Sequence, residues 1–172
     1  STLMVQGTAG TPEEAIRYGW NYARLLAEGP TRAALVESPV LRAMARGTIA
    51  RVEELTRIPS DVQDTLITIL SEKTLPIPEL GEEVAARKGF NVIATANLRD
   101  KGVSEMSAAL KRRFNFETVA AISDLARETE LVRRRAKQIV ADAGAPLGVD
   151  DAVIEALVTV FRDLRLGRTV EG

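Results

Sequence analysis

Cysteine and histidine are both absent from the 172-residue sequence. Without cysteine the chain has neither disulfides nor thiolate metal sites. Without histidine, a histidine-based catalytic triad and a histidine-ligated metal site are both excluded. Any metal that the chain binds must therefore be a hard cation held by oxygen atoms, and magnesium is the common case.

Long apolar runs and an excess of charge of one sign are also missing. No stretch approaches the roughly 20 apolar residues of a membrane-spanning helix, and no signal peptide opens the chain, so we predict a cytoplasmic protein. The net charge of −1 offers no electrostatic argument for a nucleic-acid or membrane partner. The 45% hydrophobic and 27% charged residues are typical of an ordinary globular protein with a real core.

Up to about residue 122, hydrophobic spacing and turn residues predict alternating strands and helices, and hence an α/β fold. Two prolines in Leu75-Pro76-Ile77-Pro78 favour an exposed hairpin over about 74–88, with its turn near Gly81. Strands are expected at residues 3–6, 48–52, 91–97 and 114–119, and helices at 12–28, 39–46, 60–70 and 104–111.

Beyond that point only helical patterns remain. Amphipathic helices are predicted from about Leu125 to Gly144 and from Asp150 to Leu166. We therefore predict two regions, an α/β region over residues 1–122 and an all-α region over residues 123–172.

Three polar features stand where an α/β fold places ligand-binding side chains. Glu53-Glu54 ends the strand at 48–52, Asn97 ends the strand at 91–97, and Arg112-Arg113 closes a short helix. Each has an ordinary explanation when taken alone: a solvated acidic pair, a turn-forming asparagine and cations that suit a helix C-terminus. Each also suits phosphate chemistry, in which carboxylates hold magnesium or activate water and arginine stabilises phosphoryl charge.

Taken together, the order and spacing of these motifs resemble the core of the AAA+ ATPases, and specifically the MoxR-like branch. The resemblance covers most of the chain. The Walker B segment is similar to Glu53-Glu54-Leu55-Thr56-Arg57-Ile58-Pro59, and the hairpin before the sensor strand is similar to residues 75–88. Sensor 1 is similar to Thr95-Ala96-Asn97, and the arginine-finger segment is similar to residues 109–114. The start of the helical lid is similar to residues 123–172. The implied fold is part of a P-loop-type parallel sheet flanked by helices, followed by that lid.

The resemblance also implies roles for individual residues. Glu53 takes the position of the Walker B acid that binds the magnesium of Mg²⁺-ATP, and Glu54 that of the catalytic glutamate that polarises water. Asn97 would be sensor 1, a residue that contacts the nucleotide phosphate or the attacking water. Arg57 stands where family members often keep an arginine that faces the nucleotide or the subunit interface.

For the arginine finger, Arg113 is the first choice because it directly precedes Phe114, and Arg112 is the second. The implied cofactors are ATP and Mg²⁺, and the implied assembly is a hexameric ring. MoxR-like ATPases couple hydrolysis to the remodelling or maturation of partner proteins, commonly with a von Willebrand factor A domain protein.

Two departures from the family pattern matter. Glu53 replaces the usual Walker B aspartate and moves the carboxylate out by one methylene. No G-x-x-x-x-G-K-[ST] loop occurs, and the glycines of residues 7–12 lack both its lysine and its spacing. The simplest interpretation is the back half of an ATPase, with the phosphate loop before Leu3 and sensor 2 beyond Gly172. We expect this stretch alone to be inactive and to bind ATP weakly or not at all.

The alternative is a degenerate, non-hydrolysing AAA+ homologue that serves as a structural or regulatory subunit. The glutamate at position 53 and the missing phosphate loop favour this alternative. A DNA-directed ATPase would share the fold, but nothing in the sequence supports DNA contact.

Overall fold

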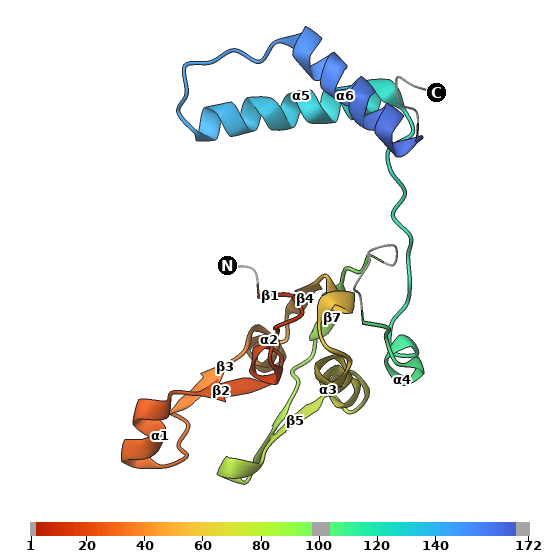
Figure 1. The fold of residues 1–172 in the computed structure, drawn as a ribbon. Helices are drawn as coiled ribbons and strands as arrows, with labels where there is room; N and C mark the ends of the chain where they lie inside the picture. The colour runs from red at the N-terminus through yellow and green to blue at the C-terminus, as the bar shows by residue number, and fades with distance from the viewer. Residues whose placement is uncertain (1–2, 98–103, 168–172) are drawn as a thin grey trace. The chain divides into compact units, whose positions relative to one another are not determined.

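The computed structural model describes residues 3–97 and 104–167. The chain divides into two compact units, Ser1–Phe116 and Glu117–Gly172, and each is described by itself (Figure 1). The first unit is α/β, and the regular secondary structure described in the second unit, up to residue 167, is helical, which confirms the predicted fold class.

A three-stranded parallel sheet forms the centre of the first unit. Its strands are β1 (Met4–Gln6), β4 (Ile49–Glu53) and β7 (Asn91–Ala94), in the order β1-β4-β7 (Figure 1). If Asn97 is to lie beside Glu53 and Glu54, the strands predicted at 48–52 and 91–97 must be adjacent, and the pairing of β4 with β7 confirms this, although β7 ends three residues before the predicted end. All three strands run in the same direction, so their carboxyl ends meet at one edge of the sheet.

Within residues 3–97 and 104–116, one face of this sheet is partly exposed and the other is buried. Val5, Ala50 and Val52 are buried on that face. They belong to a core with the helices α2 (Pro39–Arg46) and α3 (Ser60–Ser71). The alternate strand positions point the other way, and Met4, Ile49 and Ile93 are each about half exposed.

Local sequence signals explain where α2 begins and ends. The Ser38 hydroxyl accepts a hydrogen bond from the Leu41 N–H, Pro39 occupies the first turn, and Gly47 ends the helix in the left-handed conformation. Ser60 and Gln63 have the spacing that predicts a capping box at the start of α3, and this prediction is wrong. Pro59 takes the N-cap position of α3 without a side-chain hydrogen bond.

Two antiparallel hairpins extend from the first unit. One pairs β2 (Tyr18–Trp20) with β3 (Leu35–Glu37) and carries α1 (Tyr22–Glu28) between them. The other pairs β5 (Thr74–Ile77) with β6 (Glu82–Ala85) across a 3₁₀ turn, and it confirms the hairpin predicted at about 74–88.

Contacts between side chains of the two hairpins tie them together. The Tyr18 hydroxyl donates to Glu79 Oε2 at 2.8 Å, and the Arg17 guanidinium donates to the Pro76 carbonyl at 3.2 Å. Arg32 and Glu82 add an ion pair. Residues 50 to 61 positions apart in the sequence are thereby linked into one substructure.

The long helix predicted over residues 12–28 is wrong. That stretch contains a 3₁₀ turn at Glu13–Ala15, then β2, then α1. The helical spacing of apolar residues is real, but Tyr18 and Trp20 pair with β3 and their rings meet edge to face, 6.0 Å apart. Pairing with a strand 15 residues later overrides the local pattern.

Two other predicted elements also differ from the structure. The helix predicted at 104–111 is reduced to α4 (Ala108–Lys111), because Ser107 rather than Ser104 caps it. The strand predicted at 114–119 is not formed. Phe116 and Val119 are 62% and 92% exposed, and alternating residues make a strand only where another strand pairs with them.

The second unit is an antiparallel pair of helices, α5 (Leu125–Asp142) and α6 (Asp151–Arg165). Ile154 and Val158 of α6 are buried. Within residues 3–97 and 104–167, no helix has the length and apolar character needed to cross a membrane.

A charge cluster connects α5 to α6. Glu128 is buried, and its two carboxylate oxygens accept hydrogen bonds from Arg162, at 3.0 Å, and from Arg165. Arg162 also donates to the Ser123 carbonyl at 2.8 Å. These hydrogen bonds, led by that from Arg165, lower the pKa of Glu128 below its usual value.

Acid is therefore expected to destabilise the helix pair. The pKa of Glu128 is lowered in the folded state, so its ionised carboxylate contributes to the free energy of unfolding. This contribution is complete above the unfolded-state pKa of about 4.3, and it is lost as the pH falls through the folded-state pKa. Glu128→Gln should remove this pH-dependent part of the stability. Below about pH 5, wild type should therefore lose stability more steeply with falling pH than the variant. Denaturation followed by helical circular dichroism at a series of pH values measures this slope. Glu155→Gln, an exposed change on α6, should keep the wild-type slope, and an unchanged slope in Glu128→Gln would refute the role of the cluster.

Candidate functional site

Glu53, Glu54 and Thr95 meet at the carboxyl edge of the sheet. The Thr95 hydroxyl donates to Glu53 Oε2 at 2.5 Å, and the Glu54 N–H donates to the same hydroxyl at 3.1 Å. The Leu55 N–H donates to the Thr95 carbonyl at 2.8 Å. Asn97 is exposed and lies two residues beyond Thr95 on the same segment. The structure thus brings the Walker B-like and sensor-like segments together.

Glu53 is the more shielded of the two carboxylates, with 19% of its side chain exposed. Besides Thr95, it contacts Arg51 through an ion pair between Oε1 and the guanidinium. The Thr95 hydrogen bond, followed by that from Arg51, lowers the pKa of Glu53 below its usual value. Glu53 is therefore ionised at neutral pH.

Glu54 adopts a backbone conformation that is uncommon for a residue with a side chain. Its φ and ψ are 53° and 47°, in the left-handed region. Such strain persists where surrounding contacts hold it, here at the hydrogen bond to Thr95, and it often occurs at functional sites. The carboxylate itself is 45% exposed and lies 3.3 Å from the Arg57 guanidinium.

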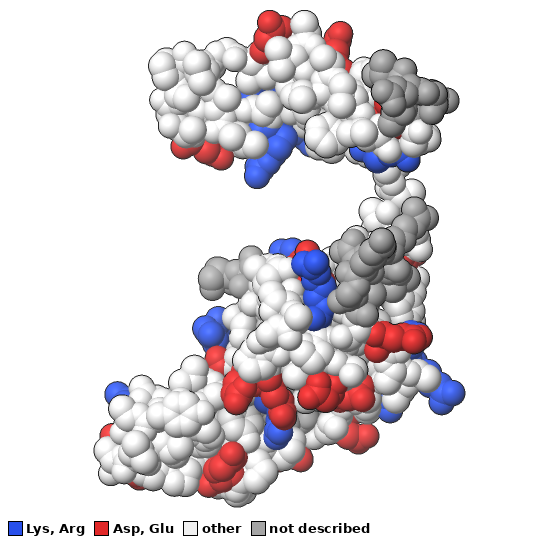
Figure 2. Space-filling model, viewed as in Figure 1, with Lys and Arg blue, Asp and Glu red and all other residues white. Residues whose placement is uncertain are grey.

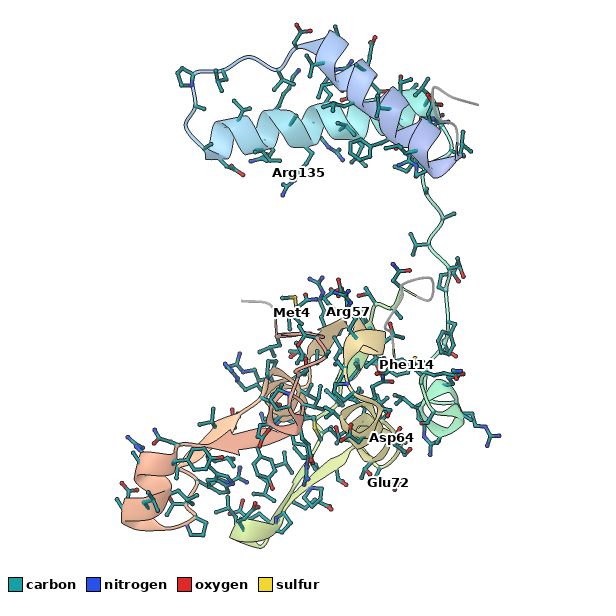
Figure 3. All side chains as sticks on the ribbon, viewed as in Figure 1. Met4, Arg57, Asp64, Glu72, Phe114 and Arg135 are labelled. Carbon is teal, nitrogen blue, oxygen red and sulfur yellow. The ribbon has the colours of Figure 1, made fainter. Side chains whose placement is uncertain are left out.

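Each of the two carboxylates has an arginine beside it, Arg51 for Glu53 and Arg57 for Glu54. Figure 3 labels Arg57 beside the ends of the strands, and Figure 2 shows basic side chains gathered at the same end of the first unit. Two arginines beside two glutamates can help to bind an anion while a carboxylate stays available for acid–base chemistry.

Arg112 and Arg113 lie away from this edge, at the end of α4. Arg113 donates to the Ser71 hydroxyl at 2.8 Å and to the Ala109 carbonyl at 2.6 Å. α4 packs on α3, where the Ser107 hydroxyl donates to Asp64 at 2.7 Å (Figure 3 labels Asp64). The two arginines therefore do not join Glu53 and Glu54 within one chain.

Three residues of the site have no assigned role in the sequence interpretation: Gly7, Arg51 and Thr95. The Gly7 N–H donates to the Glu53 carbonyl at 2.7 Å, and this contact depends on the parallel pairing of β1 with β4. Arg51 was detectable in principle, because residues two apart on a strand share a face. Thr95 was visible as part of the sensor-like motif, but its partners are set by the register of β4 and β7.

The resemblance implies a magnesium ion at this edge, held by oxygen atoms of acidic side chains. Within the part of the chain that the structure describes, no three acidic side chains gather as metal ligands. Magnesium often needs only one or two carboxylates, so Glu53 has the right chemistry. However, both of its oxygens are already engaged by Thr95 and Arg51. In this arrangement the site does not fit a cation coordinated directly by Glu53.

The first unit has a parallel sheet flanked by helices, with acidic residues at the carboxyl edge of the sheet. This arrangement is typical of α/β proteins with a P-loop-type sheet. The chain belongs to the AAA+ family, because residues 1–114 match the model described as AAA domain (dynein-related subfamily). Residues 126–172 match a second model, described as the YehL-like AAA+ ATPase C-terminal domain. The AAA+ prediction made from the motifs is thereby confirmed.

Two bacterial proteins have sequences similar to this one. The uncharacterized protein YehL of Escherichia coli (strain K12) is 54% identical over 166 residues, covering 95% of this chain and 46% of that protein. The uncharacterized protein SH1500 of Staphylococcus haemolyticus (strain JCSC1435) is 30% identical over 140 residues, covering 80% of this chain and 49% of that protein. The chain thus spans about half the length of these relatives.

Solved structures agree on the fold. A crystal structure of a candidate ATPase from Cytophaga hutchinsonii matches with a TM-score of 0.57 and 21% identity, covering 77% of this chain and 37% of that one. A complex of the BchI and BchD subunits of magnesium chelatase matches with a TM-score of 0.53 and 17% identity. This match covers 89% of this chain and 43% of that one. At these identities the likeness concerns the fold alone.

Proposed function

We propose that the chain is one half of a MoxR-like AAA+ ATPase module, the half that contains the sheet edge with the catalytic residues. The observation that carries this proposal is the meeting of Glu53, Glu54 and Thr95 at one edge of a parallel sheet. A nucleotide phosphate at this edge would lie beside an ionised carboxylate, an exposed carboxylate and the sensor-like amide of Asn97. In this proposal ATP is the nucleotide, with Mg²⁺ as its accompanying cation.

Each residue has a defined role in the proposed chemistry. Glu54 is the general base: its carboxylate is exposed enough to reach a water, while its backbone is anchored to Thr95. Asn97 orients that water or contacts the terminal phosphate. Arg57, at 3.3 Å, holds the Glu54 side chain until the nucleotide or a neighbouring subunit replaces that contact.

Arg113, with Arg112 as second choice, is proposed to act on a neighbouring subunit in a ring. Both are exposed at the end of α4 and remote from the carboxylates of their own chain, as a finger presented in trans requires. We propose that this ring is hexameric and cytoplasmic, and that it remodels or matures partner proteins. A von Willebrand factor A domain protein is the proposed partner, and residues 123–172 are the proposed start of the lid.

Residues 1–172 alone are proposed to be inactive. Backbone N–H groups and a lysine in the phosphate-binding loop normally supply most phosphate contacts, and this sequence has no such loop. A chain of the relatives' full length that contains residues 1–172 and a phosphate loop should hydrolyse ATP.

The two chains should be compared side by side. We expect phosphate release from the longer chain and none above background from residues 1–172. Calorimetry should likewise detect ATP binding by the longer chain only. Micromolar ATP binding by residues 1–172 would contradict the proposed inactivity, and a longer chain that binds but never hydrolyses ATP would contradict the ATPase proposal.

A second candidate function is a degenerate, non-hydrolysing AAA+ subunit. The ion pair between Arg51 and Glu53 favours it, because a guanidinium occupies the carboxylate that a hydrolytic site offers to the cation. The same phosphate-release assay separates the two functions.

A further inference from the structure

The Glu53 carboxylate is held on both sides by side chains of its own chain. Arg51 stands two residues earlier on β4, so both side chains lie on the same face of the strand. The guanidinium forms an ion pair with Oε1, while Oε2 accepts the Thr95 hydrogen bond at 2.5 Å. Neither oxygen is left without a donor.

The surroundings of Arg51 leave Glu53 as its natural counter-ion. Arg51 is in register with Met4 on β1 and with Ile93 on β7, and both neighbours are apolar. Among the described residues, Glu53 is the one side chain that forms a hydrogen bond or an ion pair with the Arg51 guanidinium. The Glu53 side chain is 19% exposed and the Arg51 side chain 48%, so water screens this ion pair in part.

We propose that Arg51 is the resident counter-ion of Glu53 and excludes a divalent cation from direct coordination by that carboxylate. A cation approaching Oε1 would meet the positive guanidinium at ion-pair distance, and the two like charges would repel each other. The extra methylene of glutamate, compared with aspartate, lets the carboxylate reach both Arg51 and Thr95. This inference rests on the proposed function in so far as the relevant cation is the one that accompanies ATP.

Arg51→Met tests the proposal by removing the charge while keeping an apolar stem that suits its neighbours. The probe is Mn²⁺ without nucleotide, titrated into the ¹⁵N-labelled 172-residue chain. The readout is paramagnetic broadening of the amide signals of Gly7, Glu54 and Thr95. Half-broadening in Arg51→Met should need about three- to fivefold less Mn²⁺ than in wild type, the effect expected for loss of one partly screened charge.

The controls define what overturns the proposal. Arg42→Met, at an exposed position on α2, should behave as wild type, and Arg51→Lys should restore most of the exclusion. Adding Glu53→Gln to Arg51→Met should abolish the broadening gained. Arg51→Gln provides a second neutral variant, and the amide spectrum reports folding. Equal broadening of these amides in wild type and in the neutral variants, or none in either, overturns the proposal.

Because no nucleotide is present, the result does not depend on hydrolysis. A gain of broadening in Arg51→Met together with an inactive longer chain would uphold the counter-ion and refute the ATPase. If the longer chain hydrolyses ATP but Arg51→Met shows no gain of broadening, the ATPase proposal is upheld and the counter-ion proposal is refuted.

Discussion

Glu54→Gln, in a chain of the relatives' full length, is expected to lower the rate of ATP hydrolysis by about 10²- to 10⁴-fold, the usual contribution of a general base. Glutamine has nearly the same shape but cannot accept a proton from the attacking water. ATP binding should persist, because the Glu54 contact to Thr95 is made by the backbone N–H and survives the change. Phosphate release and nucleotide binding, measured on the same preparation, separate the two effects.

Glu72→Gln is the matched control for this prediction. Glu72 caps the C-terminal end of α3, the opposite end from Arg57, and it is exposed. Its substitution should leave hydrolysis at the wild-type rate. If Glu54→Gln retains most of the wild-type rate, Glu54 is not the base and the site assignment fails.

Gly7→Ala is expected to have the second large effect, on the stability and shape of the site. A Cβ at Gly7 would lie 2.4 Å from the Glu54 carbonyl oxygen and 2.8 Å from that of Glu53. Both are backbone atoms and cannot rotate away, so the turn that carries the two carboxylates must shift. We expect a loss of about 1–3 kcal/mol in the free energy of unfolding, as for other overpacked sites.

Gly10→Ala is the control for Gly7→Ala, because a Cβ at Gly10 meets nothing within 4 Å. Its free energy of unfolding should stay within about 0.5 kcal/mol of wild type. Denaturant unfolding measures both variants, and the amide signals of Glu54 and Thr95 should move in Gly7→Ala alone. Equal stability of the two variants would show that the close approach of Gly7 to the turn is not maintained in solution.

The centre of the fold follows from sequence patterns that are local or nearly so. α2 has its own cap, N-terminal proline and terminal glycine, and the two prolines of residues 75–78 confine that segment to a hairpin. For the site, the adjacency of β4 and β7 was predictable because Glu53-Glu54 and Asn97 follow consecutive strand patterns of a parallel sheet. Signals of this kind need no knowledge of distant partners.

The failed predictions share a different origin. The stretch 12–28 carries helical spacing, but β2 within it pairs with β3, and long-range pairing prevails over local propensity. Residues 114–119 alternate like a strand but find no partner. In both cases the deciding contact lies outside the local window from which the pattern was interpreted.

The sequence alone determined the class of this protein: the acidic pair, the sensor-like asparagine and the arginine-rich helix end occur in the order of an AAA+ core, and the family match confirms it. Only the tertiary structure decided what the Glu53 carboxylate contacts. The register of three parallel strands brings Thr95 to one oxygen, and the pleat of β4 brings Arg51 to the other. Register and pleat are set by packing across the whole sheet, so no local stretch of residues contains that information.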